Sequence, residues 1–172
     1  NNGQITTLLA PLYAGGSTVI VKGKISLYAF WDLVNEYKAT WTSVMASILS
    51  ILLSLPNERK DNSLRAILCG GQILTRSVQD QFESRFNVPI FEGYGLTETA
   101  PVLACNTESD YKFGTVGQTL PSVTVKVAED GELIAYGPNI MQGYWHKEED
   151  TAQTLTADGG LLTGDIVTID ND

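Results

Sequence analysis

Strand-like and helix-like stretches alternate through the first half of this chain. Short runs rich in β-branched and apolar residues fit strands, and helical apolar spacing separates them. The strand-like runs are 17–21, 40–44, 64–69 and 88–91, and the helical patterns cover 5–13, 26–37, 45–55 and 75–86. Strand–helix–strand crossovers are right-handed and bury helices against a sheet. The alternation therefore predicts an α/β fold with a mostly parallel sheet flanked by helices.

The helical patterns also indicate which side chains face the core. Ser26 is placed to cap one helix, and Trp31 and Tyr37 lie on its apolar face. Residues 45–55 are apolar nearly all round, which predicts a buried helix. The inward positions expected over 75–86 are Val78, Phe82 and Phe86.

The pattern changes after about residue 112. Residues 123–127 alternate at period two, a turn at 129–131 follows, and 132–136 fits the return strand of a hairpin. Residues 161–169 are again strand-like. We therefore expect an α/β subdomain over 1–112, followed by a small antiparallel β subdomain over 113–172.

Charge and composition exclude several classes of protein. The net charge of −9 is unfavourable for binding nucleic acid or an anionic membrane surface. Two cysteines are too few for a disulfide scaffold, so a reduced, cytoplasmic protein is expected. No segment reaches transmembrane length, and the first residues are no signal peptide. Without an initiator Met, the chain is expected to begin within a longer protein.

Two polar, glycine-containing stretches follow neighbouring predicted strands. Gly70, Gly71 and Gln72 come after the strand over 64–69, and residues 93–99 come after the strand over 88–91. Ligands of parallel sheets bind beyond the carboxyl ends of the strands. The two stretches are therefore expected on one rim, around a shared pocket.

The stretch 91–101 reads FEGYGLTETAP and carries groups suited to a nucleotide bound with Mg²⁺. Its glycines allow close approach of a ligand to the backbone, and Tyr94 offers a flat face to a base. The hydroxyls of Thr97 and Thr99 can donate to phosphate oxygens. Glu98 is a hard oxygen ligand of the kind that Mg²⁺ takes together with phosphates. The alternative is an ordinary turn with a capping Thr and a solvated Glu.

The string from Tyr94 to Thr99 resembles the signature of the adenylate-forming (AMP-binding) enzymes: acyl-CoA synthetases, luciferases and the adenylation domains of peptide synthetases. Two later stretches are similar to family motifs in the same order. The first is 131–133 together with 137–145, and the second is Thr163, Gly164 and Asp165. The similarity runs the length of the chain.

The resemblance implies a role for particular residues. Tyr94 would stack on adenine, Thr97 would contact a phosphate, and Glu98 would hold Mg²⁺. Asp165 would accept hydrogen bonds from the ribose hydroxyls. The remaining nucleotide-binding positions that it implies are Gly70, Gly71, Gln72, Glu92, Gly93 and Gly95.

The implied reaction is that of an ATP-dependent acid–thiol ligase. A carboxylate attacks the α-phosphorus of ATP to give an acyl-adenylate, and the thiol of CoA or of a carrier protein then displaces AMP. Apolar residues around the implied pocket favour an apolar acid, as in fatty acid metabolism. That pocket is expected to include Trp41, Ser43, Val44, Met45 and Gly95.

Two alternatives stay open. An amino-acid adenylation domain would need a buried carboxylate for the amino group, and the acidic candidates are Asp80, Glu83 and Glu92. A non-catalytic nucleotide-binding or interaction module is the other. The single histidine, His146, is expected to be solvated.

Parts of the family pattern have no counterpart in these residues. They are an upstream phosphate loop with a Lys, an Arg near a hinge, and a C-terminal domain with a further Lys. Losing one such donor commonly costs roughly 10²–10³ in rate. The chain is therefore expected to be the middle of a larger synthetase and inactive alone.

Overall fold

The computed structural model describes residues 4–21, 27–56 and 61–170. A π-helical segment, Gln4–Leu9, leads into α1 (Ala10–Tyr13), and a 3-10 turn, Leu27–Ala29, leads into α2 (Phe30–Glu36). The other helices are α3 (Ala46–Ser54), α4 (Arg76–Phe86) and α5 (Glu148–Thr154). The strands are β1 (Trp41–Val44), β2 (Ala66–Gly70), β3 (Ile90–Gly95), β4 (Val102–Cys105), β5 (Gln118–Thr119), β6 (Thr124–Val127), β7 (Glu132–Tyr136) and β8 (Leu161–Ile166).

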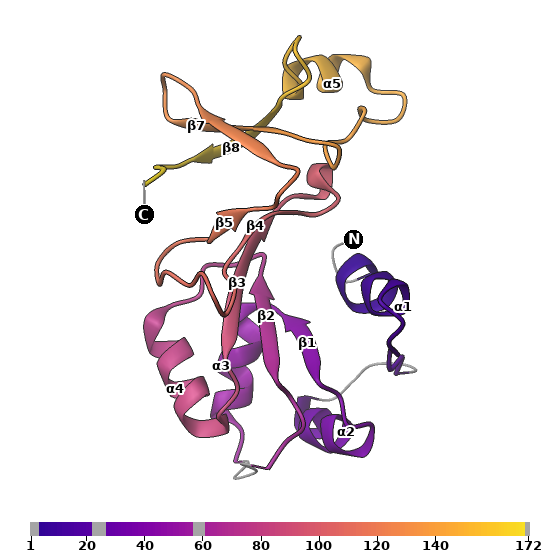
Figure 1. Ribbon diagram of the computed structural model, residues 1–172, viewed down its shortest axis with the longest axis vertical. Helices are drawn as coiled ribbons and strands as arrows, with labels where there is room; N and C mark the ends of the chain where they lie inside the picture. The colour runs from indigo at the N-terminus through magenta and orange to yellow at the C-terminus, as the bar shows by residue number, and fades with distance from the viewer. Residues whose placement is uncertain (1–3, 22–26, 57–60, 171–172) are drawn as a thin grey trace.

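The first sheet has five strands in the order β1-β2-β3-β4-β5 (Figure 1). Strands β1, β2 and β3 are parallel, with α3 and α4 as the crossovers between them. Strands β4 and β5 return antiparallel. The predicted α/β class is confirmed, as a mixed sheet whose parallel half carries the flanking helices.

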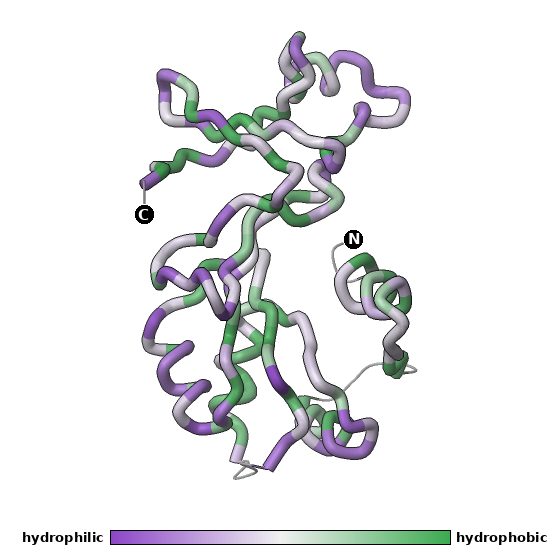
Figure 2. Tube along the Cα trace, in the orientation of Figure 1, coloured by the Kyte–Doolittle hydropathy of each residue, from purple (hydrophilic) through white to green (hydrophobic). Residues whose placement is uncertain are grey.

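One face of this sheet is covered by a helical core. Trp31 of α2 is fully buried, and its ring lies 4.5 Å from that of Phe86 and 6.2 Å from that of Phe82, both on α4. Leu49 and Leu52 of α3 complete the contact. Figure 2 shows the apolar stretches in the half of the molecule where these helices meet the sheet. The inward positions predicted for α4 are confirmed.

Two expectations about burial are wrong. Met45 and Ile51, which border or belong to α3, are 48% and 42% exposed, because only one face of α3 meets the core. Tyr37 is 53% exposed, because α2 ends at Glu36 and Tyr37 follows the helical face that carries Trp31. Ser26, the expected cap of this helix, lies outside the described residues.

The strand expected over 17–21 does not form. These residues are irregular, Ile20 is 76% exposed, and the hydroxyl of Thr18 donates to the carbonyl of Thr7. β-Branched residues favour strands only where a neighbouring strand supplies hydrogen bonds and packing. No strand of the first sheet pairs with this segment in the described part of the chain.

Strand β3 is longer than the sequence predicts. It continues from Ile90 through Gly95 because β4 turns back and pairs with it, with a register shift between Tyr94 and Gly95. The glycines of the signature stretch therefore belong to a strand, and the turn begins only at Leu96.

The second sheet contains β6, β7 and β8, all antiparallel, with α5 beside it (Figure 1). The predicted hairpin at 129–131 is confirmed. A small apolar cluster of Leu103, Val123 and Ala135 joins the two sheets. The division at 112/113 stays a prediction, since β5 still pairs with β4. No helix within the described ranges is long and apolar enough to cross a membrane.

Candidate functional site

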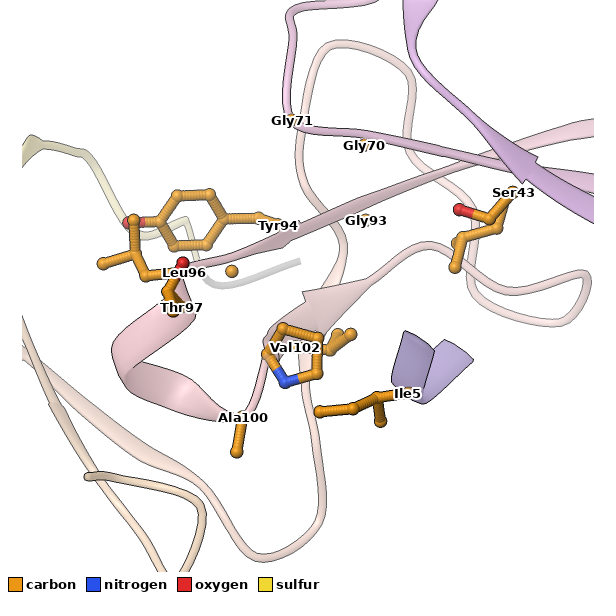
Figure 3. A pocket seen from close by; sticks show the side chains of 13 residues that line it. Ile5, Ser43, Gly70, Gly71, Gly93, Tyr94, Leu96, Thr97, Ala100 and Val102 are labelled. Carbon is orange, nitrogen blue, oxygen red and sulfur yellow. The ribbon is translucent and has the colours of Figure 1, made fainter. Parts of the chain in front are cut away.

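A cleft of about 170 Å³ opens beyond the carboxyl ends of β2 and β3, on the face of the sheet opposite the helical core. Gly70 and Gly93 are neighbours across the two strands, so the stretches after them share one rim, as the sequence predicts. Tyr94, Leu96 and Thr97 lie at one end of the cleft, and Ser43 and Ile5 lie at the other (Figure 3). The lining residues are Ile5, Ser43, Leu68, Gly70, Gly71, Gly93, Tyr94, Gly95, Leu96, Thr97, Ala100, Pro101 and Val102.

Gly95 has a steric reason to be glycine. A Cβ at this position would lie 1.8 Å from the carbonyl oxygen of Pro101, which is backbone and cannot move aside cheaply. At Gly93 the nearest atom would be the flexible Cδ1 of Leu68, at 3.3 Å. Gly95 therefore allows β3 and the segment after the turn to approach each other at the floor of the cleft.

Thr99 does not serve the cleft. Its side chain is fully buried, and its hydroxyl lies 2.9 Å from the Leu96 carbonyl and 2.6 Å from the Pro101 carbonyl. The same oxygen accepts a hydrogen bond from the Leu96 amide. The expectation that Thr99 donates to a phosphate is therefore wrong, because its proton is used to close the turn. Thr97 is exposed and lines the cleft.

Glu98 is half-buried within the same turn and is not among the residues that line the cleft. Its Oε1 accepts a hydrogen bond of 2.8 Å from the Tyr144 hydroxyl. This hydrogen bond raises the pKa of Tyr144. No group of three or more potential metal ligands occurs among the described residues. One carboxylate fits Mg²⁺ that arrives with phosphates and water, and it does not fit a self-contained metal centre.

Tyr94 connects the cleft to the second sheet. Its hydroxyl donates to Oδ2 of Asp165, on β8, at 2.5 Å. Burial and this hydrogen bond raise the pKa of Tyr94 to about 12. Asp165 is exposed at the same rim. The structure thus brings the predicted adenine-stacking ring and the predicted ribose acceptor into direct contact, while their roles stay predictions.

Gln72 and Glu92 do not line the cleft. The side-chain oxygen of Gln72 accepts from the amide of Ser47, near the start of α3. Glu92 faces the helical side of the sheet, where its Oε1 accepts from the amide of Leu74. Burial raises the pKa of Glu92, and the Leu74 amide partly offsets that effect. In this structure both side chains hold the segment that follows β2.

The residues expected around an acyl group separate into two sets. Ser43 and Gly95 line the cleft, whereas Trp41, Val44 and Met45 do not. Ile5, Leu68, Pro101 and Val102 line it without having been predicted. Strand alternation could have found Leu68, because its neighbours Ile67 and Cys69 are fully buried on the opposite face. Burial raises the pKa of the Cys69 thiol to about 11. His146 is exposed beside Trp145, as expected.

The fold and the ordered motifs are those of an α/β protein of the adenylate-forming type. A family model described as AMP-binding enzyme matches residues 1–145, and the chain belongs to that family.

Relatives of known name are longer CoA ligases. The chain is 32% identical to the peroxisomal OPC-8:0-CoA ligase 1 of Arabidopsis thaliana, over 94% of this chain and 33% of that protein. It is 32% identical to the 4-coumarate–CoA ligase of Pinus taeda, over 97% of this chain and 34% of that protein. The chain thus spans about a third of the length of these relatives.

Solved structures of CoA ligases and of MatB have a similar fold. Apo MatB from Rhodopseudomonas palustris matches with a TM-score of 0.87 at 27% identity, over 99% of this chain and 36% of that one. An anthranilate CoA ligase in complex with anthranoyl-AMP matches with a TM-score of 0.90 at 22% identity, over 98% and 35% of the two chains, which supports the fold alone.

Proposed function

We propose that this chain is the nucleotide-binding part of an AMP-forming acid–CoA ligase. The observation that carries the proposal is the contact between Tyr94 and Asp165, which places an aromatic face and a carboxylate together at the rim of the cleft. An adenosine needs both groups: a flat surface for its base and an acceptor for its ribose hydroxyls. The names of the relatives agree with this class of reaction.

In the proposed reaction, a carboxylate oxygen attacks the α-phosphorus of ATP and pyrophosphate leaves, giving an acyl-adenylate. The thiol of CoA then attacks the acyl carbon and AMP leaves. Thr97, exposed at the cleft, would donate to a phosphate oxygen, and Glu98 would hold Mg²⁺, which neutralises phosphate charge. The protein's own contribution is to position the reactants.

The acid proposed as substrate has an apolar body. Ile5, Leu68 and Val102 line the cleft, and no residue lining it within the described ranges is charged. An amino acid would leave its ammonium group without a counter-charge there, at high cost. Glu92 is the acidic candidate that directly precedes Gly93 of the cleft, but its side chain accepts a hydrogen bond from the Leu74 amide instead. These contacts favour an apolar or aryl acid over the amino-acid alternative.

ATP–pyrophosphate exchange tests the proposal. The assay should be run on this chain and on the full reading frame that contains it, with fatty, aryl and amino acids. Exchange that depends on a fatty or aryl acid is the expected result, and the inactivity expected of the chain alone is checked in the same assay. Exchange with amino acids only would favour the adenylation-domain alternative. Bound AMP without any exchange would favour a non-catalytic module.

CoA as the acceptor and a cytoplasmic location also stay proposals.

A further inference from the structure

The motif over 137–145 has no role in the function proposed so far, yet it lies against the signature turn. It leaves the second sheet at the end of β7 and reaches α5, and on the way it passes the 3-10 turn Thr97–Thr99. Residues 139–144 contact this turn through both backbone and side chains. We call this segment the 139–144 brace.

Hydrogen bonds to backbone carbonyls attach the brace to the second half of the turn and to the start of β4. The side-chain amide of Asn139 donates to the carbonyl of Thr99 at 2.9 Å and to that of Val102 at 3.1 Å. The amide of Met141 donates to the carbonyl of Glu98 at 2.8 Å. These bonds satisfy carbonyls that a short 3-10 helix leaves open. The turn is therefore held in place by a segment some forty residues further along the chain.

The brace is itself anchored. The amide of Tyr144 donates to the hydroxyl of Thr151 in α5 at 2.9 Å, and that hydroxyl donates to the carbonyl of Lys147. Gly143 has φ +146, and a Cβ there would lie 2.9 Å from Cγ2 of Thr151. Glycine is therefore needed for the brace to approach α5. These contacts fix the position of the Tyr144 backbone, from which its ring extends.

The contact that matters for chemistry joins the Tyr144 hydroxyl to Oε1 of Glu98. A phenol orients a carboxylate without cancelling its charge, whereas a Lys or Arg partner would compete with a bound cation. Among the described residues, no basic side chain forms an ion pair with Glu98. Its Oε2 has no hydrogen-bond partner within the same part of the chain. The carboxylate is thus oriented by one phenol and open on one side.

We propose that Tyr144 is a positioning residue, which holds the Glu98 carboxylate toward a divalent cation bound with the nucleotide. The 139–144 brace fixes the turn that carries Glu98. The inference rests on the proposed function, because it takes Glu98 to be the cation ligand. It gives the motif over 137–145, which links β7 to α5, a role beside the signature turn.

The test is equilibrium binding of ATP to the full reading frame, measured once with Mg²⁺ and once with EDTA. Partners of metal ligands commonly contribute about 10- to 100-fold to metal affinity. Tyr144→Phe should weaken Mg–ATP binding by about tenfold, at the lower end of that range because the contact is partly exposed. Binding in EDTA should change by less than about twofold. Glu98→Gln should abolish the gain from Mg²⁺, and Tyr144→Phe should add no further loss to it.

Tyr136→Phe is the matched control. It also removes a phenol that donates to a carboxylate, that of Asp158 at 3.2 Å, and neither of these residues forms a hydrogen bond with the turn in the described part of the chain. It should leave both affinities unchanged. Equal losses with Mg²⁺ and with EDTA in Tyr144→Phe, or failure of this variant to fold, would overturn the inference in favour of a purely structural contact.

The outcomes separate this inference from the function beneath it. If the wild type binds ATP equally well with Mg²⁺ and with EDTA, or does not bind ATP at all, the role of Glu98 and the inference are both overturned. A Mg²⁺ effect that disappears in Glu98→Gln but stays intact in Tyr144→Phe would overturn the positioning role alone.

Discussion

The hydroxyl of Tyr94 lies 2.5 Å from Oδ2 of Asp165, although 71 residues separate them in the chain. Tyr94 lies near the end of β3 in the first sheet, and Asp165 lies in β8 of the second sheet. The contact orients the carboxylate, and no hydrogen bond engages its Oδ1 within the described residues. Each residue alone is only weak evidence for a nucleotide-binding site, and the contact between the two strengthens that evidence.

This contact predicts how nucleotide analogues will bind. Asp165→Asn should weaken ATP binding and remove most of the preference for ATP over its 2′,3′-dideoxy analogue, because a ribose acceptor has been lost. Tyr94→Phe keeps the aromatic face and loses only the orienting bond, so the loss should be smaller, about three- to tenfold, for a bond worth about 1 kcal/mol. Calorimetric titration with the two nucleotides measures both. An unchanged preference in Asp165→Asn would contradict the ribose assignment.

Gly95→Ala should destabilise the protein severely. The added Cβ would meet the Pro101 carbonyl at 1.8 Å, so the backbone of β3 must shift. A loss above about 3 kcal/mol is expected, in the range of the most damaging single substitutions. Gly93→Ala is the control, since its Cβ meets only the end of a Leu side chain at 3.3 Å, and its effect should stay below about 1 kcal/mol. Thermal unfolding of both variants decides, and similar melting temperatures would refute the steric argument.

Thr99→Val should destabilise the signature turn although it preserves side-chain volume. It leaves the Leu96 amide without its acceptor and removes the donor to two carbonyls in a fully buried position. An unsatisfied buried group costs about 1–3 kcal/mol. Thr99→Ser keeps the hydroxyl and should lose less. Chemical denaturation would show this difference, and equal midpoints for the two variants would argue against the hydrogen-bond account.

Glu92 predicts a pH dependence of stability. Burial raises its folded pKa above 4.5, so the folded state binds a proton more tightly than the unfolded state does. The contribution of Glu92 to stability is therefore most favourable below the unfolded pKa and is lost as the pH rises through the folded pKa.

Glu92→Gln removes this dependence and keeps an oxygen for the Leu74 amide. The variant should melt at a higher temperature than the wild type at neutral pH, and the two should converge near pH 4. Melting curves across this range provide the measurement. A variant that is less stable than the wild type at neutral pH would contradict this prediction, because it would show that the charged Glu92 carboxylate stabilises the folded protein.

Much of the fold follows from local pattern. The strands and helices between β1 and β3 were predictable because a helical face at 3.6-residue spacing and β-branched runs report on burial directly. The rim shared by Gly70 and Gly93 followed from the parallel order of the strands. The run over 17–21 shows the limit of this reasoning, since its strand-like composition finds no strand to pair with.

By itself, the sequence determined the alternating elements, the two glycine-bearing segments at one edge of the sheet and the residue types suited to a nucleotide. Tertiary structure alone decided what each side chain contacts. It turned Thr99 inward, directed Glu92 to the Leu74 amide, joined Tyr94 to Asp165 and set Tyr144 against Glu98. Local periodicity reports whether a residue is buried, whereas a hydrogen bond between distant segments depends on how two sheets pack, which no local pattern encodes.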